Sequence, residues 1–152
     1  MGEFFGSMYC WLEDFYGLEL ADYLWGLSSP EQQSNMYIGI GLSMLCISFF
    51  MVVTYYYIVN HPRLNNWWGW LIFASVNATI NFVVGWQWVL KDYYNGLMVT
   101  KSAATGKMVD LHIYESDILA FGITNMIDAI LAFLLFSYII KWWSSNCSRA
   151  PF

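Results

Sequence analysis

Residues 118–143 read ILAFGITNMIDAILAFLLFSYIIKWW, a long apolar stretch that ends in a lysine and two tryptophans. About 20 consecutive apolar residues are enough for a helix to cross the hydrocarbon core of a bilayer. Asp128 lies near the middle of the stretch, one turn after Thr124 and Asn125. A carboxylate is costly at that depth, so it needs a structural or functional reason. The stretch therefore predicts a membrane-spanning helix with a polar face inside the protein.

The composition of the whole 152-residue chain is also typical of a protein whose solvent is lipid. Hydrophobic residues make up 59% of the chain and charged residues 11%, whereas soluble domains hold about 45–50% and about 25%. The mean hydropathy is +0.46. Aromatic residues reach 20% of the chain, which is typical of side chains gathered at membrane interfaces. The length suits one compact unit.

Two further apolar stretches precede the first one in the chain, and the short polar loop between them contains Pro62, which ends a helix. We therefore predict an all-α integral membrane protein with three transmembrane helices, at about residues 36–59, 67–90 and 118–143. Tryptophans gather at the ends of the second and third stretches, where an interfacial belt is expected. The belt comprises Trp67, Trp68, Trp70, Trp86, Trp88, Trp142 and Trp143.

Residues 1–35 differ in character, and we separate them from a membrane domain of residues 36–152. They carry acids and no Lys or Arg, which argues against both a secretory signal peptide and a spanning helix. The spacing of their large apolar residues predicts one or two short amphipathic helices, broken near Gly17. An acidic polar face favours docking on protein over docking on anionic lipid. The expected apolar face comprises Met8, Trp11, Leu12, Phe15 and Leu18, and the residues expected to contact a protein partner are Trp11, Phe15, Glu13, Asp14 and Asp22.

Residues 91–116 form the longest loop of the chain. Residues 97–100 are rich in strand-forming side chains, residues 102–106 form a turn cluster, and residues 108–113 alternate between apolar and polar. This pattern predicts a small β-hairpin. An isolated two-stranded hairpin is only marginally stable in water, so we expect the N-terminal segment or a neighbouring subunit to support it.

Polar residues in the three spans fall at similar depths. With a rise of about 1.5 Å per residue, Asp128 lies roughly 15 Å from the start of its span. The same count places small polar and amide side chains of the other two spans in one layer with it. We expect Asp128 to pack against Asn77 and Asn81, within one chain or across a subunit boundary. The predicted intramembrane polar layer comprises Asp128, Asn125, Thr124, Asn77, Asn81, Ser43 and Ser48.

Three interpretations of this polar layer remain open. In the first, the amides and Asp128 join the helices by hydrogen bonds, as polar groups do in membranes. In the second, Asp128 lines an ion or proton path in an oligomer, because intramembrane acids mark such paths. In the third, the layer binds a small ligand or a lipid headgroup.

Several function classes find no support in the sequence. Six Lys and Arg residues without a cluster and a net charge of −5 argue against nucleic-acid binding. The three cysteines are far apart and predict neither a disulfide framework nor a metal site, and we expect no cofactor. His61 and His112 fall in different loops, and no catalytic motif is present, so no catalytic residue is assigned.

The organisation resembles that of small multispan subunits of bacterial envelope machines and of membrane-acting defence or toxin-immunity systems. The resemblance implies a bacterial inner-membrane protein. Basic residues are denser in the loop at 60–66 and in the C-terminal tail, which favours a cytoplasmic C-terminus. Three spans form only a thin core, so we expect a homo-oligomer with a further protein partner for the N-terminal segment. The first hypothesis is a non-enzymatic subunit or anchor of a larger assembly. The alternative is a pore or an ion- or proton-conducting oligomer lined by Asp128 and Asn81.

Overall fold

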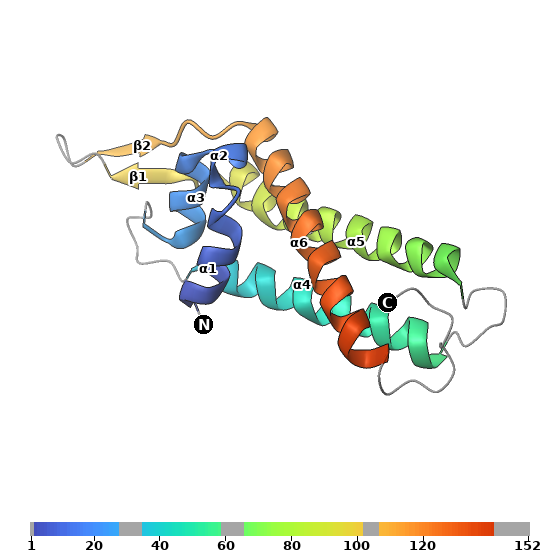
Figure 1. The fold of residues 1–152 in the computed structure, drawn as a ribbon. Coiled ribbons are helices and arrows are strands. Elements are labelled where there is room, and N and C mark those ends of the chain that lie inside the picture. The colour runs from blue at the N-terminus through green and yellow to red at the C-terminus, as the bar shows by residue number, and fades with distance from the viewer. Residues whose placement is uncertain (1, 28–34, 59–65, 102–106, 142–152) are drawn as a thin grey trace.

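In a computed structural model of the protein, three long helices form the body of the molecule (Figure 1). Each is long and apolar enough to cross a membrane. The three predicted helices are confirmed; the second ends four residues later, and the third begins three residues earlier, than the bounds expected for the spans. The helices are α4 (Met36–Val53), continued by a π-helical stretch η1 (Thr54–Ile58), α5 (Trp67–Tyr94) and α6 (Glu115–Lys141). The structure describes residues 2–27, 35–58, 66–101 and 107–141, so Trp142 and Trp143 lie outside the described residues.

Asparagine side chains mark where two of the long helices begin. Asn35 accepts a hydrogen bond from the backbone N–H of Tyr37 at 2.9 Å. Asn66 accepts one from the backbone N–H of Gly69 at 3.0 Å. Each bond satisfies an N–H group that has no partner within its own helix, which is why asparagine favours this position.

The N-terminal segment folds into three short helices that pack on the bundle of the same chain (Figure 1). They are α1 (Gly2–Cys10), α2 (Glu13–Tyr16) and α3 (Leu18–Trp25). Gly17 separates α2 from α3 with a φ of 93°, a backbone conformation that other residues rarely adopt. The predicted break near Gly17 is therefore confirmed. We call residues 2–25, which comprise α1, α2, α3 and the turns between them, the N-terminal wedge, because they lie between α4 and the first turns of α6.

The buried face of the N-terminal wedge differs from the apolar face that we predicted. Trp11, Phe15 and Leu18 are exposed, and Met8 and Leu12 are half-buried. The reason is that the chain leaves helical geometry after Cys10 and again at Gly17, so one helical period does not run through the segment. The side chains that fill the core instead are Phe5, Tyr9, Tyr16, Leu20, Tyr23 and Leu24.

The predicted hairpin is present between α5 and α6. Strand β1 (Val99–Lys101) pairs antiparallel with β2 (Met108–Asp110), and Thr100 lies opposite Val109. The chain between β2 and α6 is held to the wedge, because Glu19 accepts a hydrogen bond from the backbone N–H of His112 at 2.8 Å. Of the two supports that we expected for the hairpin, the N-terminal segment thus contacts the chain next to it, at His112.

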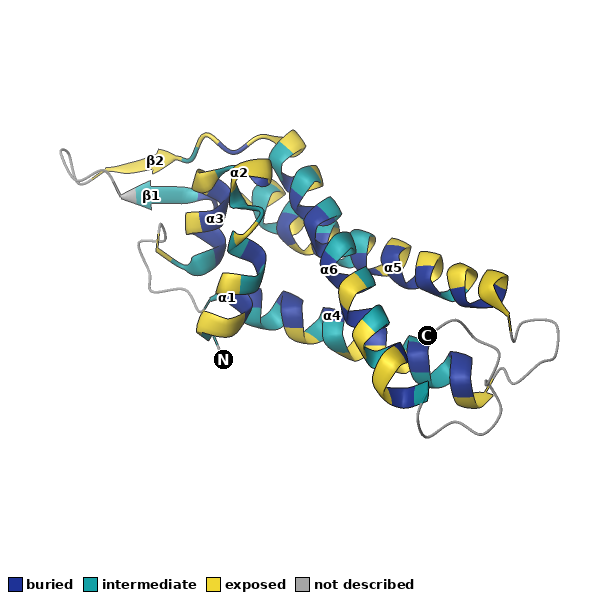
Figure 2. Cartoon of the chain, in the orientation of Figure 1, coloured by how far each residue is buried: buried dark blue, intermediate teal, exposed yellow. Residues whose placement is uncertain are grey.

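Two main groups of buried side chains lie at the two ends of the bundle, and buried residues follow the helix faces that meet (Figure 2). At the end that holds the wedge, Tyr37 of α4 and Phe121 of α6 are buried among the wedge's aromatic rings. At the other end, Val52, Trp70 and Phe133 bring α4, α5 and α6 into direct contact. The predicted polar layer lies between these two groups.

Candidate functional site

Asn77 lies at the centre of the polar layer and joins all three long helices. Its amide Nδ2 donates to Ser48 Oγ of α4 at 3.1 Å and to the carbonyl oxygen of Ala129 of α6 at 3.0 Å. Ser48 Oγ also donates to the Ala129 carbonyl at 3.5 Å. All three residues are fully buried. A single amide on α5 therefore holds α4 and α6 together at this depth.

The amide network continues from Asn77 along α5 and across to α6. Asn81 Nδ2 donates to the carbonyl oxygen of Asn77 at 3.0 Å and to its Oδ1 at 3.1 Å. Asn125 Nδ2 donates to the Asn81 carbonyl at 2.7 Å. This approach depends on Gly85, where an added Cβ would lie 2.8 Å from Asn125 Nδ2. Small residues at such contacts let helices approach closely in lipid.

The N-terminal wedge contributes to the same network, which the sequence did not predict. Tyr9 donates its hydroxyl to Asn125 Oδ1 at 2.6 Å. Burial, with the nearby charge of Asp128, raises the pKa of Tyr9 above its ordinary value, so the hydroxyl stays protonated and acts as a donor. Tyr9 also stacks on Tyr37 with ring centroids 5.2 Å apart. One signal in the sequence fits this placement: tyrosines recur at 9, 16 and 23, and all three are buried.

Tyr16 fixes the wedge to α4 by a second set of hydroxyl contacts. Its hydroxyl lies 2.9 Å from that of Tyr37, and it donates to the carbonyl oxygen of Tyr9 at 3.3 Å. Tyr37 in turn donates to the carbonyl oxygen of Ala21 at 3.3 Å. These bonds satisfy polar atoms inside an aromatic core, where an unpaired hydroxyl would be costly.

Asp128 contacts the wedge rather than the asparagines that we expected as its partners. Its Oδ1 accepts a hydrogen bond from Trp11 Nε1 at 3.4 Å, while the Trp11 ring remains 58% exposed. The neighbouring Asn125 takes the position against α5 that we predicted for Asp128. The N-terminal segment therefore contacts Asp128 through Trp11.

Two oxygens of the layer remain without a partner among the described residues. They are Asp128 Oδ2 and Asn81 Oδ1, and both atoms are buried. Buried polar atoms are usually paired, so these two are the positions where a water molecule or a cation would find acceptors. The amide nitrogens of Asn77 and Asn125 join long helices, whereas that of Asn81 donates within α5.

Two predicted members of the layer stay outside the network that joins the helices. Ser43 Oγ donates to the carbonyl oxygen of Gly39 at 2.9 Å, and Thr124 Oγ1 donates to that of Ala120 at 3.2 Å. Each bond lies within the residue's own helix. Their place in the sequence predicted their depth but not their hydrogen-bond partners.

The predicted tryptophan belt is only partly at the surface. Trp67, Trp68 and Trp88 are exposed and Trp86 is half-buried. Trp70 is buried in the core at the far end of the bundle, and its Nε1 donates to Ser137 Oγ of α6 at 3.2 Å. Trp70 is therefore a packing residue rather than part of an interfacial belt.

Four of the five residues predicted to contact a partner lie at the surface of the wedge. Trp11, Phe15, Asp14 and Asp22 are exposed, while Glu13 is half-buried. The described part of the chain contains no group of His, Cys, Asp or Glu side chains that could hold a metal ion. Comparison with protein-family models, curated proteins and solved structures finds no match to this chain.

Proposed function

We propose that this chain is a non-enzymatic integral membrane protein that oligomerises and serves as a subunit or anchor of a larger bacterial membrane assembly. The observation that carries the proposal is the pair of hydrogen bonds that the Asn77 amide donates to Ser48 of α4 and to Ala129 of α6 within one chain. An amide whose hydrogens are used between helices stabilises a bundle and does not line a path. Bonds of this kind contribute about 0.6 kcal/mol on average in membrane proteins and at most about 1.7 kcal/mol.

The exposed side of the wedge is the surface that would contact the assembly. Trp11, Phe15 and Leu18 expose more than half of their surface, and the acids Asp14 and Asp22 lie among them. Aromatic side chains surrounded by polar residues are typical of protein interfaces. An envelope machine or a defence or immunity system of the bacterial inner membrane is the proposed setting. Basic residues at 63, 141 and 149 support a cytoplasmic C-terminus.

A second candidate function is conduction by an oligomer, with Asp128 and Asn81 lining the path. It is favoured by the two buried oxygens without a partner, Asp128 Oδ2 and Asn81 Oδ1. Intramembrane acids that retain a free acceptor are typical of ion and proton paths. In this alternative, Trp11 would have to move from Asp128 before the path opened.

One pair of measurements separates the two candidates. The full chain is reconstituted in liposomes for proton and cation flux, and its stoichiometry is measured in nanodiscs by light scattering. The subunit proposal predicts an oligomer that does not conduct, with Asp128→Asn unchanged in flux. Conduction that Asp128→Asn alters, while the surface variant Asp110→Asn does not, would support the alternative and overturn the first proposal. A monomer without flux would contradict both.

A further inference from the structure

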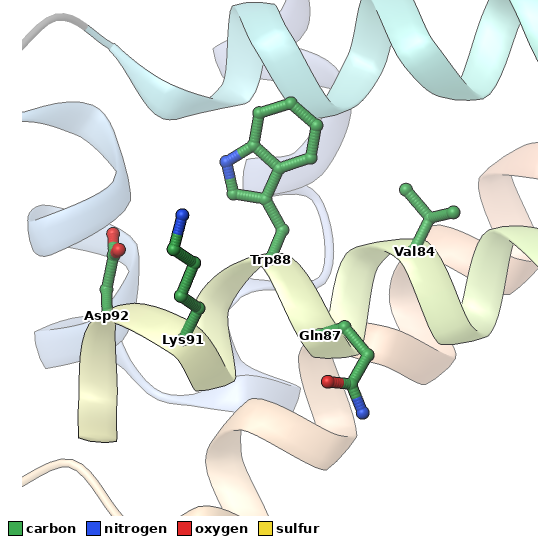
Figure 3. A pocket seen from close by; sticks show the side chains of 5 residues that line it. All are labelled: Val84, Gln87, Trp88, Lys91 and Asp92. Carbon is green, nitrogen blue, oxygen red and sulfur yellow. The ribbon is translucent and has the colours of Figure 1, made fainter. Parts of the chain in front are cut away.

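An open groove lies at the end of α5, beside α4 and α3 and away from the polar layer. It has a volume of about 470 Å³ and is lined by Val84, Gln87, Trp88, Lys91 and Asp92. Figure 3 shows Lys91 between Trp88 and Asp92, with these three side chains directed toward α4 and α3. The groove therefore presents a cation, an anion and an aromatic ring within two turns of one helix.

Neighbouring helices fix the two sides of the groove. The Trp88 ring packs on α4 at Gly39, where an added Cβ would lie 3.3 Å from the ring. Asp92 Oδ2 accepts a hydrogen bond from the hydroxyl of Tyr23 of α3 at 3.4 Å. That bond uses one oxygen of the carboxylate and orients the side chain, while Lys91 is exposed. Contacts with α4 and α3 thus hold the side chains on both sides of the groove in place.

The side chains along this part of α5 change from apolar to charged, as a lipid does from its acyl chain to its headgroup. Val84 lies seven residues before Lys91, roughly 10 Å deeper along the helix. Trp88 lies between them, at the level where indole rings gather in membranes. An acyl chain would contact Val84 and the Trp88 ring, and a headgroup would reach Lys91 and Asp92.

We propose that this groove binds a phosphatidylethanolamine molecule, with its phosphate at Lys91 and its ammonium group at Asp92. The proposal rests on the membrane insertion that the proposed function assumes. The adjacent opposite charges match a headgroup that carries one charge of each sign. A phosphatidylglycerol headgroup would leave the Asp92 carboxylate without a cation, and the quaternary ammonium of phosphatidylcholine has no N–H to donate to it.

Native mass spectrometry of the full chain in detergent, titrated with each of the three lipids, tests the assignment. We expect phosphatidylethanolamine to bind about fivefold more tightly than the other two, as one solvent-accessible charge pair allows. Lys91→Gln should weaken all three lipids, because each has a phosphate. Asp92→Asn keeps an oxygen for Tyr23 and should remove only the preference for phosphatidylethanolamine. The control Lys107→Gln removes an exposed cation outside the groove and should change nothing.

Two outcomes would overturn the assignment. One is equal affinity for the three lipids in the wild type, which would mean non-selective lipid around the bundle. The other is a loss of affinity in Lys107→Gln as large as that in Lys91→Gln. The readout does not depend on stoichiometry or flux, so a non-conducting monomer that still prefers phosphatidylethanolamine contradicts only the proposed function. An oligomer without lipid preference contradicts only this assignment.

Discussion

The two ends of the helix bundle are packed in different ways. At one end α4 and α6 are separated, and the N-terminal wedge fills the space with Tyr9 against Tyr37 and Phe121 (Figure 1). At the other end the long helices meet directly through Trp70 and Phe133, with ring centroids 5.6 Å apart. The first end depends on a separate segment of the chain, and the second depends only on the helices themselves.

This difference implies that the two ends can loosen independently, with the polar layer as the boundary between them. Tyr9 and Trp11 tie the wedge to the layer by two hydrogen bonds. Asn77 ties the long helices to one another without any contribution from the wedge. Proteins open in contiguous units, and the wedge is one such unit outside the three long helices. The wedge is therefore the element that we expect to open first.

The largest expected effect is the loss of wedge packing in Gly41→Leu. A Cβ at Gly41 would lie 2.2 Å from the ring of Phe5, which is buried in α1, so α1 has to move away from α4. Overpacking of this kind costs about 1 to 3 kcal/mol. Hydrogen exchange followed by mass spectrometry should show faster exchange in α1, α2 and α3 and unchanged exchange in η1.

A matched control for this variant is Leu42→Phe, which enlarges the next side chain on the exposed face of α4. It should leave exchange in the wedge unchanged. Faster exchange at both ends of the bundle in Gly41→Leu would show that the two ends do not open independently.

A smaller effect is expected from Asn77→Leu, which changes the polar layer between the two ends. The substitution removes the amide from Ser48 Oγ and from the Ala129 carbonyl. We expect a loss of about 1 to 2 kcal/mol in the free energy of unfolding, since two bonds are lost and each contributes about 0.6 kcal/mol on average and at most about 1.7 kcal/mol. Unfolding in mixed detergent micelles measures the loss, and both ends of the bundle should exchange faster.

The control for Asn77→Leu is Thr79→Leu on the exposed face of the same helix. The hydroxyl of Thr79 donates only to the carbonyl oxygen of Ser75 one turn earlier, so its removal breaks no contact between helices. An equal loss of stability in the two variants would mean that the amide network does not join the helices in solution.

The smallest effect concerns Cys10, at the end of α1, and reports whether the wedge is in place. Burial, followed by the hydrogen bond and charge of Glu13, raises the pKa of the Cys10 thiol to about 11. The thiolate is the reactive form, so alkylation below that pH should be slow and should accelerate as the pH rises toward 11. Glu13→Gln removes the charge, lowers the pKa of Cys10 and should speed alkylation at pH 8 by about threefold to tenfold.

Maleimide labelling of a chain carrying Cys46→Ala and Cys147→Ser measures this rate at the remaining thiol. Asp14→Asn, a charge change on the exposed side of α2, is the matched control and should leave the rate unchanged. Labelling in Glu13→Gln as slow as in the parent chain would contradict the contact. If Gly41→Leu also speeds the labelling of Cys10, the exposure of this thiol reports displacement of the wedge.

Local sequence patterns predicted the parts of this protein that depend on neighbours in the chain. The three long helices follow from apolar stretches, the hairpin from alternation around a turn cluster, and the break at Gly17 from a residue that tolerates positive φ. Depth counting also brought Asn77, Asn125 and Ser48 to one level, because a helix rises by a constant amount per residue. These features are properties of short segments, so one sequence is enough to predict them.

Partners across the fold could not be predicted in the same way. Depth alone did not distinguish Asn125, which contacts α5, from Asp128, which contacts Trp11. Nor did it show that Trp70 is buried while Trp68 is exposed. Rotation of each helix about its own axis decides these contacts, and that rotation depends on the packing of all the elements together.

The sequence by itself determined a chain of three long apolar helices, a small hairpin and an acidic, aromatic N-terminal segment. Only the tertiary structure decided that this segment packs between α4 and α6, with Tyr9 and Trp11 on the polar layer. The physical reason is that periodicity in a sequence shows which side chains share a face of one element. It does not show which other element covers that face.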